Sequence, residues 1–375
     1  MKRYDSVFHL PTKVIMGDNC IFEHRSLLKE LGDKALIVTG KRSAKANGSY
    51  RDLVKALEAN GQAYCLYDQV MSNPTVDCVF EAAALARQER CDWVIAIGGG
   101  SPMDAAKAAA ALAVQPVPQA SLFSSVFSQA LPIVAVPTTA GTGAEVTPNA
   151  VLTNDAAQTK TSVAAPVLVP RLAFLDARYM QGLPQSITIN TAIDALSHGI
   201  EGLLSVRASP WSDVLAKASI GAIADCFPAL EGAAAEWNQS QVRQKLLWAA
   251  TLGGMVIAHT GTIAVHAMGY MLTYFKDIDH GRANGLLLGR YLQLVQAKER
   301  AEDPPRIPEL LLAMHIPNVE TFTGILDRLL GKRERCNATE LAYYADRAIT
   351  AKNSANGLIP VTREELLEVF STSLG

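Results

Sequence analysis

Residues 191–202 read TAIDALSHGIEG and place Asp194 and His198 four positions apart in a helix-compatible run. Side chains at that spacing lie on one face of a helix, so the pair can grip one cation, although many such pairs form only an ion pair or a hydrogen bond. Ile193 and Leu196 make the surroundings apolar. An ionised aspartate there needs a partner that offsets its lost hydration, and a metal cation would supply one.

Two histidines downstream complete a candidate ligand set: His266 in AVHAMGYML and His280 in DIDHGRANG. One carboxylate and three imidazoles suit Zn²⁺ or Fe²⁺ and suit Mg²⁺ poorly. We interpret His259, in MVIAHTGT, as a core or cleft histidine. The predicted metal ligands are therefore Asp194, His198, His266 and His280.

The hydrophobic periodicity changes along the chain. Before residue 176, apolar runs of strand length alternate with helix-compatible segments, whereas from Pro184 onward the pattern is helical almost throughout. Strands that alternate with helices indicate a parallel sheet covered on both faces. We predict an α/β protein with an N-terminal Rossmann-like parallel-sheet domain over residues 1–180 and a C-terminal all-helical metal-binding domain over residues 181–375.

The segments expected in the first domain begin with two short strands that meet at a bend within residues 6–16. Further strands are predicted at 35–39, 62–67, 93–97, 133–136, 150–153 and 172–175, and helices at 21–31, 50–60, 76–89 and up to residue 113. In the second domain, helices are predicted at 187–204, 211–224, 241–258, 263–272 and 284–296.

A glycine-rich turn follows the predicted strand 93–97: residues 98–107 read GGGSPMDAAK. Glycines at the end of a strand, followed by a helix N-terminus, present backbone N–H groups and the helix dipole to an anion such as a diphosphate. Ser101 is expected at the capping position of the helix. A plain tight turn is the alternative, and the motif is neither GxGxxG nor a Walker A loop.

A second loop, PTTAGTGAEVT at 137–147, follows the predicted strand 133–136. Its threonine hydroxyls and glycine backbone could line the other half of a nucleotide cleft, because open α/β sheets bind ligands at the C-terminal ends of their strands. A surface loop rich in Thr and Gly fits the same residues.

The composition limits the range of functions. A chain of 375 residues is too long for one core, and 49% hydrophobic with 19% charged residues describes an ordinary core-rich protein. The net charge of −2 offers no basic footprint for nucleic acid. No apolar run of about 18 residues indicates a membrane span, and no signal peptide is recognised, so we expect a cytoplasmic protein. Six dispersed cysteines without a CxxC pair read as buried apolar residues.

Taken in this order, GGGSPMDAAK, PTTAGTGAEVT, DALSH at 194–198, His266 and the pair His280-Gly281 resemble the iron-containing (group III) alcohol dehydrogenases over nearly the whole chain. A more distant likeness to glycerol dehydrogenase and 3-dehydroquinate synthase implies a dehydroquinate synthase-like architecture. The resemblance implies reversible hydride transfer between NAD(P)H and a small alcohol or aldehyde, with Fe²⁺, or Zn²⁺, held by the four predicted ligands. It also implies a homodimer.

The resemblance also implies the cofactor residues. Around the diphosphate it places Gly98, Gly99 and Ser101, with Asp104 in the helix behind it. Near the nicotinamide side it places Thr138, Thr139 and Thr142, and in a loop that approaches the adenosine Asn73 and Pro74. Thr147 and Lys160 are further cofactor residues that it implies.

Two departures from the family pattern affect the function. NAD-preferring relatives tend to carry an Asp where this chain has Gly40, and here Lys41, Arg42 and Ser43 follow. Loss of a carboxylate and gain of cations would accommodate a 2′-phosphate, so NADP(H) is predicted over NAD(H), unless Lys41 and Arg42 are merely solvated. At Tyr270, several relatives have a histidine discussed in proton transfer, so a phenol or a water molecule must serve here.

Two other kinds of protein remain as alternatives. A lyase or cyclase like dehydroquinate synthase would need a basic pocket for a phosphorylated acid, and the helical half shows little clustering of Lys or Arg near Asp194 or His266. A non-catalytic nucleotide sensor would be favoured by a missing metal ligand, and all four are present.

Overall fold

The computed structural model describes residues 5–300 and 305–375, and their contacts divide into two compact units. One unit spans His9–Gly182 and contains the sheet; the other spans Leu183–Gly375 and is helical. Residues 5–8 belong to the helical unit, where Phe8 stacks on His259 with 4.4 Å between ring centroids. The predicted division at 180/181 placed residues 5–8 in the sheet domain instead.

The α/β unit is built on a six-stranded parallel sheet in the order β1-β8-β5-β4-β2-β3. Its strands are β1 (Lys13–Met16), β2 (Lys34–Gly40), β3 (Ala63–Val70), β4 (Trp93–Gly98), β5 (Ile133–Pro137) and β8 (Leu172–Leu175). Its helices are α1 (Cys20–Glu23), α2 (Ser26–Lys29), α3 (Ser43–Ala46), α4 (Ser49–Asn60), α5 (Val76–Gln88) and α6 (Gly100–Val114). The predicted Rossmann-like parallel-sheet class is confirmed.

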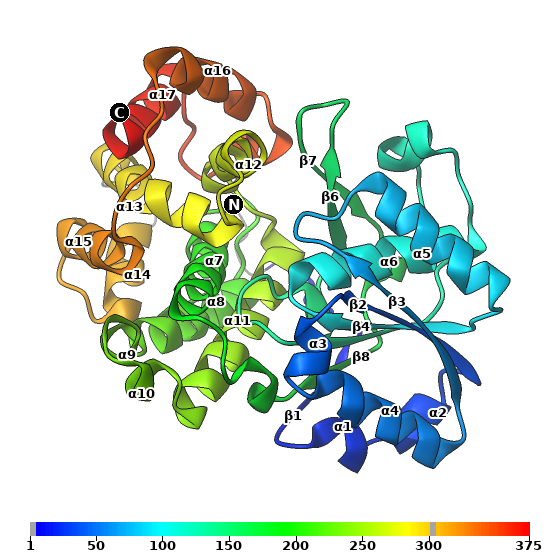
Figure 1. Ribbon diagram of the computed structural model, residues 1–375. Coiled ribbons are helices and arrows are strands. Elements are labelled where there is room, and N and C mark those ends of the chain that lie inside the picture. The colour runs from blue at the N-terminus through cyan, green and yellow to red at the C-terminus, as the bar shows by residue number, and fades with distance from the viewer. Residues whose placement is uncertain (1–4, 301–304) are drawn as a thin grey trace. The chain divides into compact units, whose positions relative to one another are not determined.

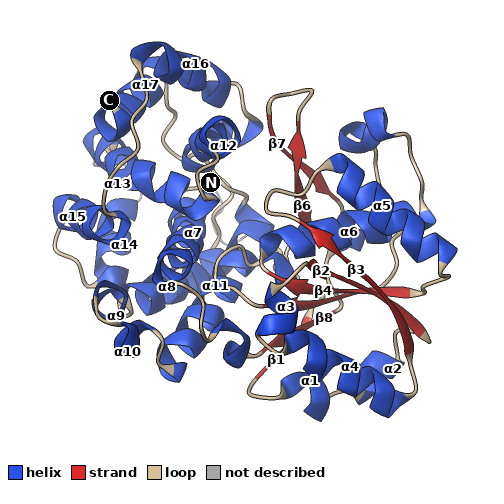
Figure 2. Ribbon diagram, in the orientation of Figure 1, coloured by secondary structure: helices blue, strands red, loops and turns tan. Residues whose placement is uncertain are grey.

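Helices cover both faces of this sheet, as Figure 2 shows. Along β2, Leu36 and Val38 pack with α5 and α6, whereas Ile37 packs with α1 and α4 on the opposite face. This alternation follows from the two-residue period of a strand, and burial on both faces explains why β2 reads as a continuous apolar run.

The strand order reverses between β2 and β4. From β2 the chain continues outward to β3, then returns to β4 on the other side of β2 and proceeds to β5. In open α/β sheets, ligands bind at the C-terminal ends of the strands at such a switch point. The segment that begins at Gly40 and the glycine turn at Gly98 end the two strands that flank it.

An antiparallel hairpin of β6 (Asn149–Asn154) and β7 (Thr159–Ala164) forms a separate two-stranded sheet. A strand was predicted at 150–153, but β7 was not predicted. The reason is its composition: TKTSVA is polar and only its Val163 is buried, so it carries little apolar signal. Lys160 thus lies on a strand, paired with Thr153.

Two other predictions for the first unit were wrong. No strand forms in residues 6–12, where Pro11 has no N–H to donate. The predicted helix 21–31 is split into α1 and α2. Arg25 Nη1 donates to the Phe22 carbonyl at 2.9 Å, and that interaction engages the end of α1.

The helical unit has α7 (Gln185–Leu203) in its interior, packed against α8 (Pro210–Ala224), α11 (Ser240–Thr260) and α13 (His280–Lys298) (Figure 1). Fifteen of its residues, from Thr188 to Leu203, are buried. The helices are α7 (Gln185–Leu203), α8 (Pro210–Ala224), α9 (Phe227–Glu231), α10 (Ala234–Trp237), α11 (Ser240–Thr260), α12 (Ala264–Lys276), α13 (His280–Lys298), α14 (Arg306–Met314), α15 (Val319–Leu330), α16 (Ala338–Ile349) and α17 (Arg363–Leu374). The predicted all-helical character is confirmed.

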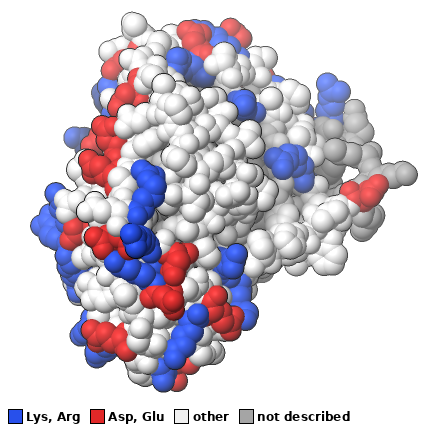
Figure 3. All heavy atoms as spheres, turned by 90° about the vertical axis from the view of Figure 1, so that its right-hand side faces the viewer, with Lys and Arg blue, Asp and Glu red and all other residues white. Residues whose placement is uncertain are grey.

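Charged side chains of both signs are interspersed on the face in Figure 3. Among the described residues, no single helix is long and apolar enough to cross a membrane; α11 and α12 reach that length and composition only together, across a bend of 111°.

The close packing of α7 on α11 makes Gly202 a sensitive position. A Cβ there would lie 2.0 Å from Val256 Cγ1, so we expect Gly202→Ala to lower the free energy of unfolding by about 1–3 kcal/mol through overpacking. Gly324→Ala is the matched control, because a Cβ at that helical glycine meets only the flexible end of Arg328 at 3.7 Å. The control should be neutral or gain up to about 1 kcal/mol. Urea unfolding measures both, and equal effects would refute the packing argument.

Candidate functional site

Three helices bring the four predicted ligands together in the helical unit. Asp194 and His198 lie one turn apart on α7, His266 lies in the first turn of α12, and His280 is the first residue of α13. Asp194 Oδ1 is 3.9 Å from the Nε2 atom of each of the three histidines. We call these four residues the donor set.

The donor set fits a divalent ion. Two donors that share one ion at about 2.1 Å are at most about 4.2 Å apart, so separations of 3.9 Å allow joint coordination. Donor atoms of Asp194, His198 and His266 all lie within 4.8 Å of one another, and all three residues are buried. The His280 side chain is 28% exposed, which makes it the ligand that faces outward.

Asn284 contacts most of the donor set and was not predicted. Its Nδ2 donates to Asp194 Oδ1 at 3.1 Å and lies 3.3 Å from Nε2 of both His266 and His280. Its Oδ1 is buried without a hydrogen-bond partner among the described residues. A partly positive amide group thus faces the atoms that a cation would contact. Asn284 follows His280 by four residues on α13, so helical spacing could have identified it.

Glu201 is a second residue that the sequence analysis missed. It is fully buried on α7, and its carboxylate contacts both the backbone N–H and the Nδ1 atom of His266. The signal was its spacing, because Asp194, His198 and Glu201 occupy positions i, i+4 and i+7 of one helical face.

The charges in this cluster stabilise one another. Burial acts to raise the pKa of Asp194, but the three histidines and the Asn284 amide hold that pKa below its usual value. Burial acts to lower the pKa of His266, but the Glu201 and Asp194 carboxylates raise it above its usual value. The arrangement therefore keeps the Asp194 carboxylate ionised, as a metal ligand must be.

The position of His280 depends on a glycine. A Cβ at Gly281 would lie 1.9 Å from the Asn190 carbonyl oxygen and 2.9 Å from Asp194 Cβ. Only glycine lets α13 begin this close to α7, which explains the His-Gly pair seen in the sequence.

Tyr270 lies one turn after His266 on α12. Its ring stacks on His280 with 5.1 Å between centroids and an interplanar angle of 16°. The phenol is therefore beside the outward-facing ligand.

In the α/β unit, the two predicted nucleotide loops meet. Thr138 N–H donates to the Gly98 carbonyl at 2.9 Å, and a Cβ at Gly100 would lie 2.6 Å from Thr142 Cγ2. A Cβ at Gly99 would lie 3.0 Å from Thr139 Oγ1. The glycine turn at the N-terminus of α6 and the threonine loop after β5 thus form one continuous wall, which can hold a diphosphate.

The prediction that Ser101 caps α6 was wrong, because the N-cap residue of α6 is Gly99. Ser101 Oγ instead accepts from Asn73 N–H at 3.2 Å, and the Asn73 carbonyl accepts from Thr153 Oγ1 at 3.1 Å. Pro74 follows Asn73, and its carbonyl accepts from Thr153 N–H at 2.9 Å. Ser101 therefore ties the loop after β3 to the glycine turn.

Two oppositely charged residues follow the glycine turn on α6, the half-buried Asp104 and, three residues later, the fully buried Lys107. Burial raises the pKa of Asp104, against the attraction of Lys107 and Lys160, and burial lowers the pKa of Lys107. Lys107 Nζ donates to the Thr147 carbonyl, to Thr147 Oγ1 and to the Asn149 carbonyl at 2.8–3.0 Å. Lys107, which was not predicted, thus anchors the end of the threonine loop. Lys160 Nζ donates to Thr153 Oγ1 at 3.3 Å.

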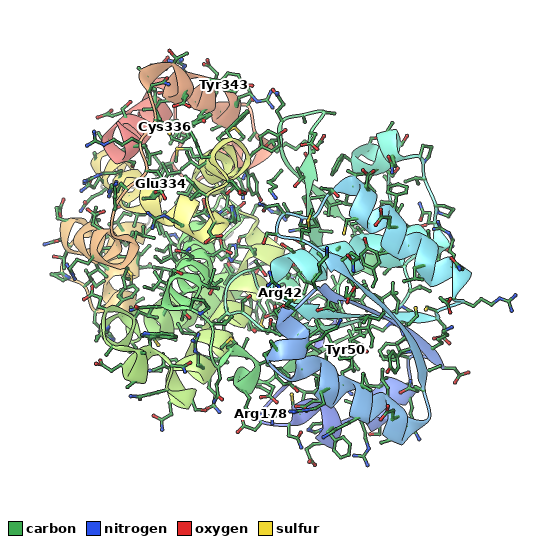
Figure 4. The ribbon with its side chains drawn as sticks, in the orientation of Figure 1. Arg42, Tyr50, Arg178, Glu334, Cys336 and Tyr343 are labelled. Atoms are coloured by element: carbon green, nitrogen blue, oxygen red, sulfur yellow. The ribbon has the colours of Figure 1, made fainter. Side chains whose placement is uncertain are left out.

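The segment after β2 is exposed at Lys41, Arg42 and Ser43. Arg42 precedes the short helix α3, and Figure 4 shows it at that end of the helix. A Cβ at Gly40 would lie 3.3 Å from the Val70 carbonyl oxygen, a tight contact for any larger residue. This edge therefore presents cations and no carboxylate at Gly40.

Comparisons with known proteins agree with both halves of this description. A family model described as iron-containing alcohol dehydrogenase matches residues 11–177, and one described as the C-terminal part of the Fe-containing alcohol dehydrogenase family matches residues 188–374.

Individual proteins give the same result. The chain is 34% identical over 283 residues to the probable alcohol dehydrogenase EutG of Escherichia coli, covering 75% of this chain and 71% of that protein. It is 36% identical over 259 residues to lactaldehyde reductase of Escherichia coli, covering 68% of this chain and 66% of that protein. A solved iron-containing alcohol dehydrogenase of Thermotoga maritima is 35% identical, with a TM-score of 0.88, covering 98% of this chain and 99% of that chain.

Loss of the Ser101 hydroxyl should loosen the loop at Asn73. We expect Ser101→Ala to weaken nucleotide binding by about 1 kcal/mol, or roughly fivefold in Kd, because one hydrogen bond that orders the site is lost. Calorimetric titration with NADPH measures the change. Ser124→Ala is the control, since its exposed hydroxyl donates to the Ser121 carbonyl and to no other group of residues 5–300 and 305–375. Equal affinity of both variants would contradict the proposed role of Ser101.

Proposed function

The chain belongs to the iron-containing alcohol dehydrogenase family, and we propose that the donor set holds the metal of its hydride-transfer site. The family predicted from the motifs is confirmed, and with it an oxidoreductase that uses iron and NAD(P). The proposal concerns which residues serve the reaction, which nucleotide is preferred and which substrates are used.

The observation that carries the proposal is the equal approach of three imidazole Nε2 atoms to one buried carboxylate oxygen. Bound Fe²⁺ or Zn²⁺ would act there as a Lewis acid, which eases deprotonation of an alcohol and polarises the carbonyl of an aldehyde. Asp194 contributes the negative charge, and the histidines contribute neutral nitrogen donors. His280, the most exposed of the four ligands, marks the side from which a substrate approaches.

Tyr270 is proposed to move the proton that accompanies hydride transfer. Its ring stacks on His280, the most exposed of the four ligands. A phenol can donate and accept a proton through one hydroxyl, directly or through water.

The glycine turn and the threonine loop are proposed to hold the diphosphate of the nucleotide. The turn supplies backbone N–H groups and a helix N-terminus, and Ser101 orders the neighbouring loop. Lys107 fastens the end of the threonine loop to α6, and Asp104 lies three residues before Lys107 on the same helix.

NADP(H) is proposed as the preferred nucleotide. Gly40 ends β2 at the switch point of the sheet, where a carboxylate would bind the adenosine ribose in an NAD enzyme. Exposed Lys41 and Arg42 follow and can pair with a 2′-phosphate.

Small alcohols and aldehydes are proposed as substrates, in keeping with relatives named lactaldehyde reductase and 1,3-propanediol dehydrogenase. The homodimer and the cytoplasmic location stay predictions.

Metal removal tests the donor set. Protein stripped with a chelator should lose reduction of short aldehydes and regain it after anaerobic addition of Fe²⁺. His266→Ala should lose Fe²⁺-dependent turnover by at least about 100-fold and still bind NADPH, because the nucleotide residues lie in the other unit. The control is His24→Ala, an exposed histidine on the α/β unit. Full Fe²⁺-dependent activity of His266→Ala would contradict the ligand assignment.

Replacement of Lys41 and Arg42 tests the nucleotide preference. The double variant Lys41→Ala/Arg42→Ala should raise KM for NADPH by about tenfold or more, because charge-assisted hydrogen bonds to a phosphate are worth roughly 1.5–3 kcal/mol. Its KM for NADH should stay unchanged. Lys29→Ala/Lys55→Ala removes the same charge from exposed positions of the same unit. An unchanged ratio of the two KM values would refute the preference.

A further inference from the structure

Glu201 contacts His266 through both of its carboxylate oxygens. Oε1 accepts from the His266 backbone N–H at 3.1 Å, and Oε2 contacts His266 Nδ1. The carboxylate is fully buried, and His266 itself is 2% exposed, so both contacts are shielded from water. One side chain therefore engages both the backbone and the ring of one predicted metal ligand.

The backbone contact supplies a hydrogen-bond acceptor to the N-terminus of α12. The first N–H groups of a helix have no partner within the helix, and His266 is the third residue of α12. The N-cap residue of α12 is Ile263, whose side chain makes no capping hydrogen bond. Glu201, from α7, supplies that acceptor from another helix and so connects the start of α12 to the helix that carries Asp194 and His198.

The ring contact determines how His266 is presented. A carboxylate at Nδ1 requires a hydrogen on Nδ1, and a neutral imidazole then has its lone pair on Nε2. On the opposite side of the ring, the Asn284 amide nitrogen lies 3.3 Å from Nε2 as a donor, which requires the same lone pair. The two neighbours agree on one tautomer, the one that can coordinate an ion beside Asp194 Oδ1.

From this geometry we propose that Glu201 is a positioning residue, which holds His266 in the Nδ1-protonated tautomer and so prepares Nε2 for the metal. The inference deepens the proposed function, since it rests on His266 as a ligand. Partners that donate or accept beyond the direct ligands fix the orientation and raise the basicity of metal-bound histidines.

A carboxylate is needed at position 201 because the backbone N–H and the Nδ1–H of His266 each require an acceptor. Glutamine offers one acceptor and one donor group. If its oxygen accepts from the His266 backbone, its NH₂ faces Nδ1 and favours hydrogen on Nε2, which blocks coordination. If it turns over, its NH₂ faces the backbone N–H of α12. Aspartate keeps both acceptors on a chain one methylene shorter.

The first measurement needs no metal. Long-range ¹H–¹⁵N correlation spectra of the metal-free protein, recorded with ¹⁵N-labelled histidine at a pH high enough to keep the His266 ring neutral, report the tautomer of each neutral ring, and His266→Ala assigns the His266 signals. We expect the Nδ1-protonated form in the wild type and in Glu201→Asp, and the Nε2-protonated form in Glu201→Gln. An Nε2-protonated His266 in the wild type, or an unchanged tautomer in Glu201→Gln, would overturn the proposal.

The second measurement is the Kd for Zn²⁺ by competition with a chelator. Glu201→Gln should bind about 10–100-fold more weakly than the wild type, and Glu201→Asp should lie between the two. The matched control is Glu365→Gln in the same unit. The Glu365 carboxylate also accepts from a backbone N–H at the start of a helix, that of Thr362, but it contacts no predicted metal ligand. If Glu365→Gln weakens Zn²⁺ binding as much as Glu201→Gln does, the effect is general loss of stability and the proposal fails.

The outcomes separate this inference from the proposed function. A wild type that binds no Zn²⁺ and no Fe²⁺ would refute the metal site, whereas the tautomer measurement would still decide the role of Glu201. If Glu201→Gln does not fold, Glu201→Asp decides: the retained tautomer supports the proposal, and its loss contradicts it.

Discussion

The pairing of the Asp194 carboxylate with three imidazoles is the interaction on which the helical unit depends. A buried carboxylate without partners is costly by several kcal/mol, and Asp194 is only 4% exposed. Its partners come from α7, α12 and α13, so three helices meet at one buried carboxylate. The glycine at 281 permits the approach of α13, and Glu201 fixes the start of α12. Packing and chemistry therefore impose the same arrangement.

The α/β unit carries the loops that are proposed to bind the diphosphate of the nucleotide. Parallel strands end at one edge of the sheet, and the reversal of strand order between β2 and β4 opens that edge for a ligand. The glycine turn, the threonine loop and the loop at Asn73 are then tied together by Thr138, Ser101 and Lys107. Most of these contacts involve backbone groups, which explains why small residues dominate the motifs.

The sequence was informative where a pattern is local. Helical spacing at Asp194 and His198 predicted α7, and apolar β-branched runs predicted β2 and β4. It was uninformative where the decisive partner is distant. Glu201 and Asn284 show their role only after three helices have met, although each shares a helical face with a predicted ligand. The polar strand β7 is stabilised by pairing with β6, and Phe8 stacks on His259 of α11, more than 200 positions away. Neither β7 nor the N-terminal segment shows a hydrophobic periodicity from which its structure could be predicted.

Asp194, His198, His266 and His280 are proposed to share one ion. An anomalous difference map at the iron absorption edge, from crystals of protein loaded with Fe²⁺ under anaerobic conditions, tests this coordination. Shared coordination predicts one peak about 2.1 Å from Asp194 Oδ1 and from the three Nε2 atoms. A map without a peak at these atoms, or with its peak at other residues, would contradict it.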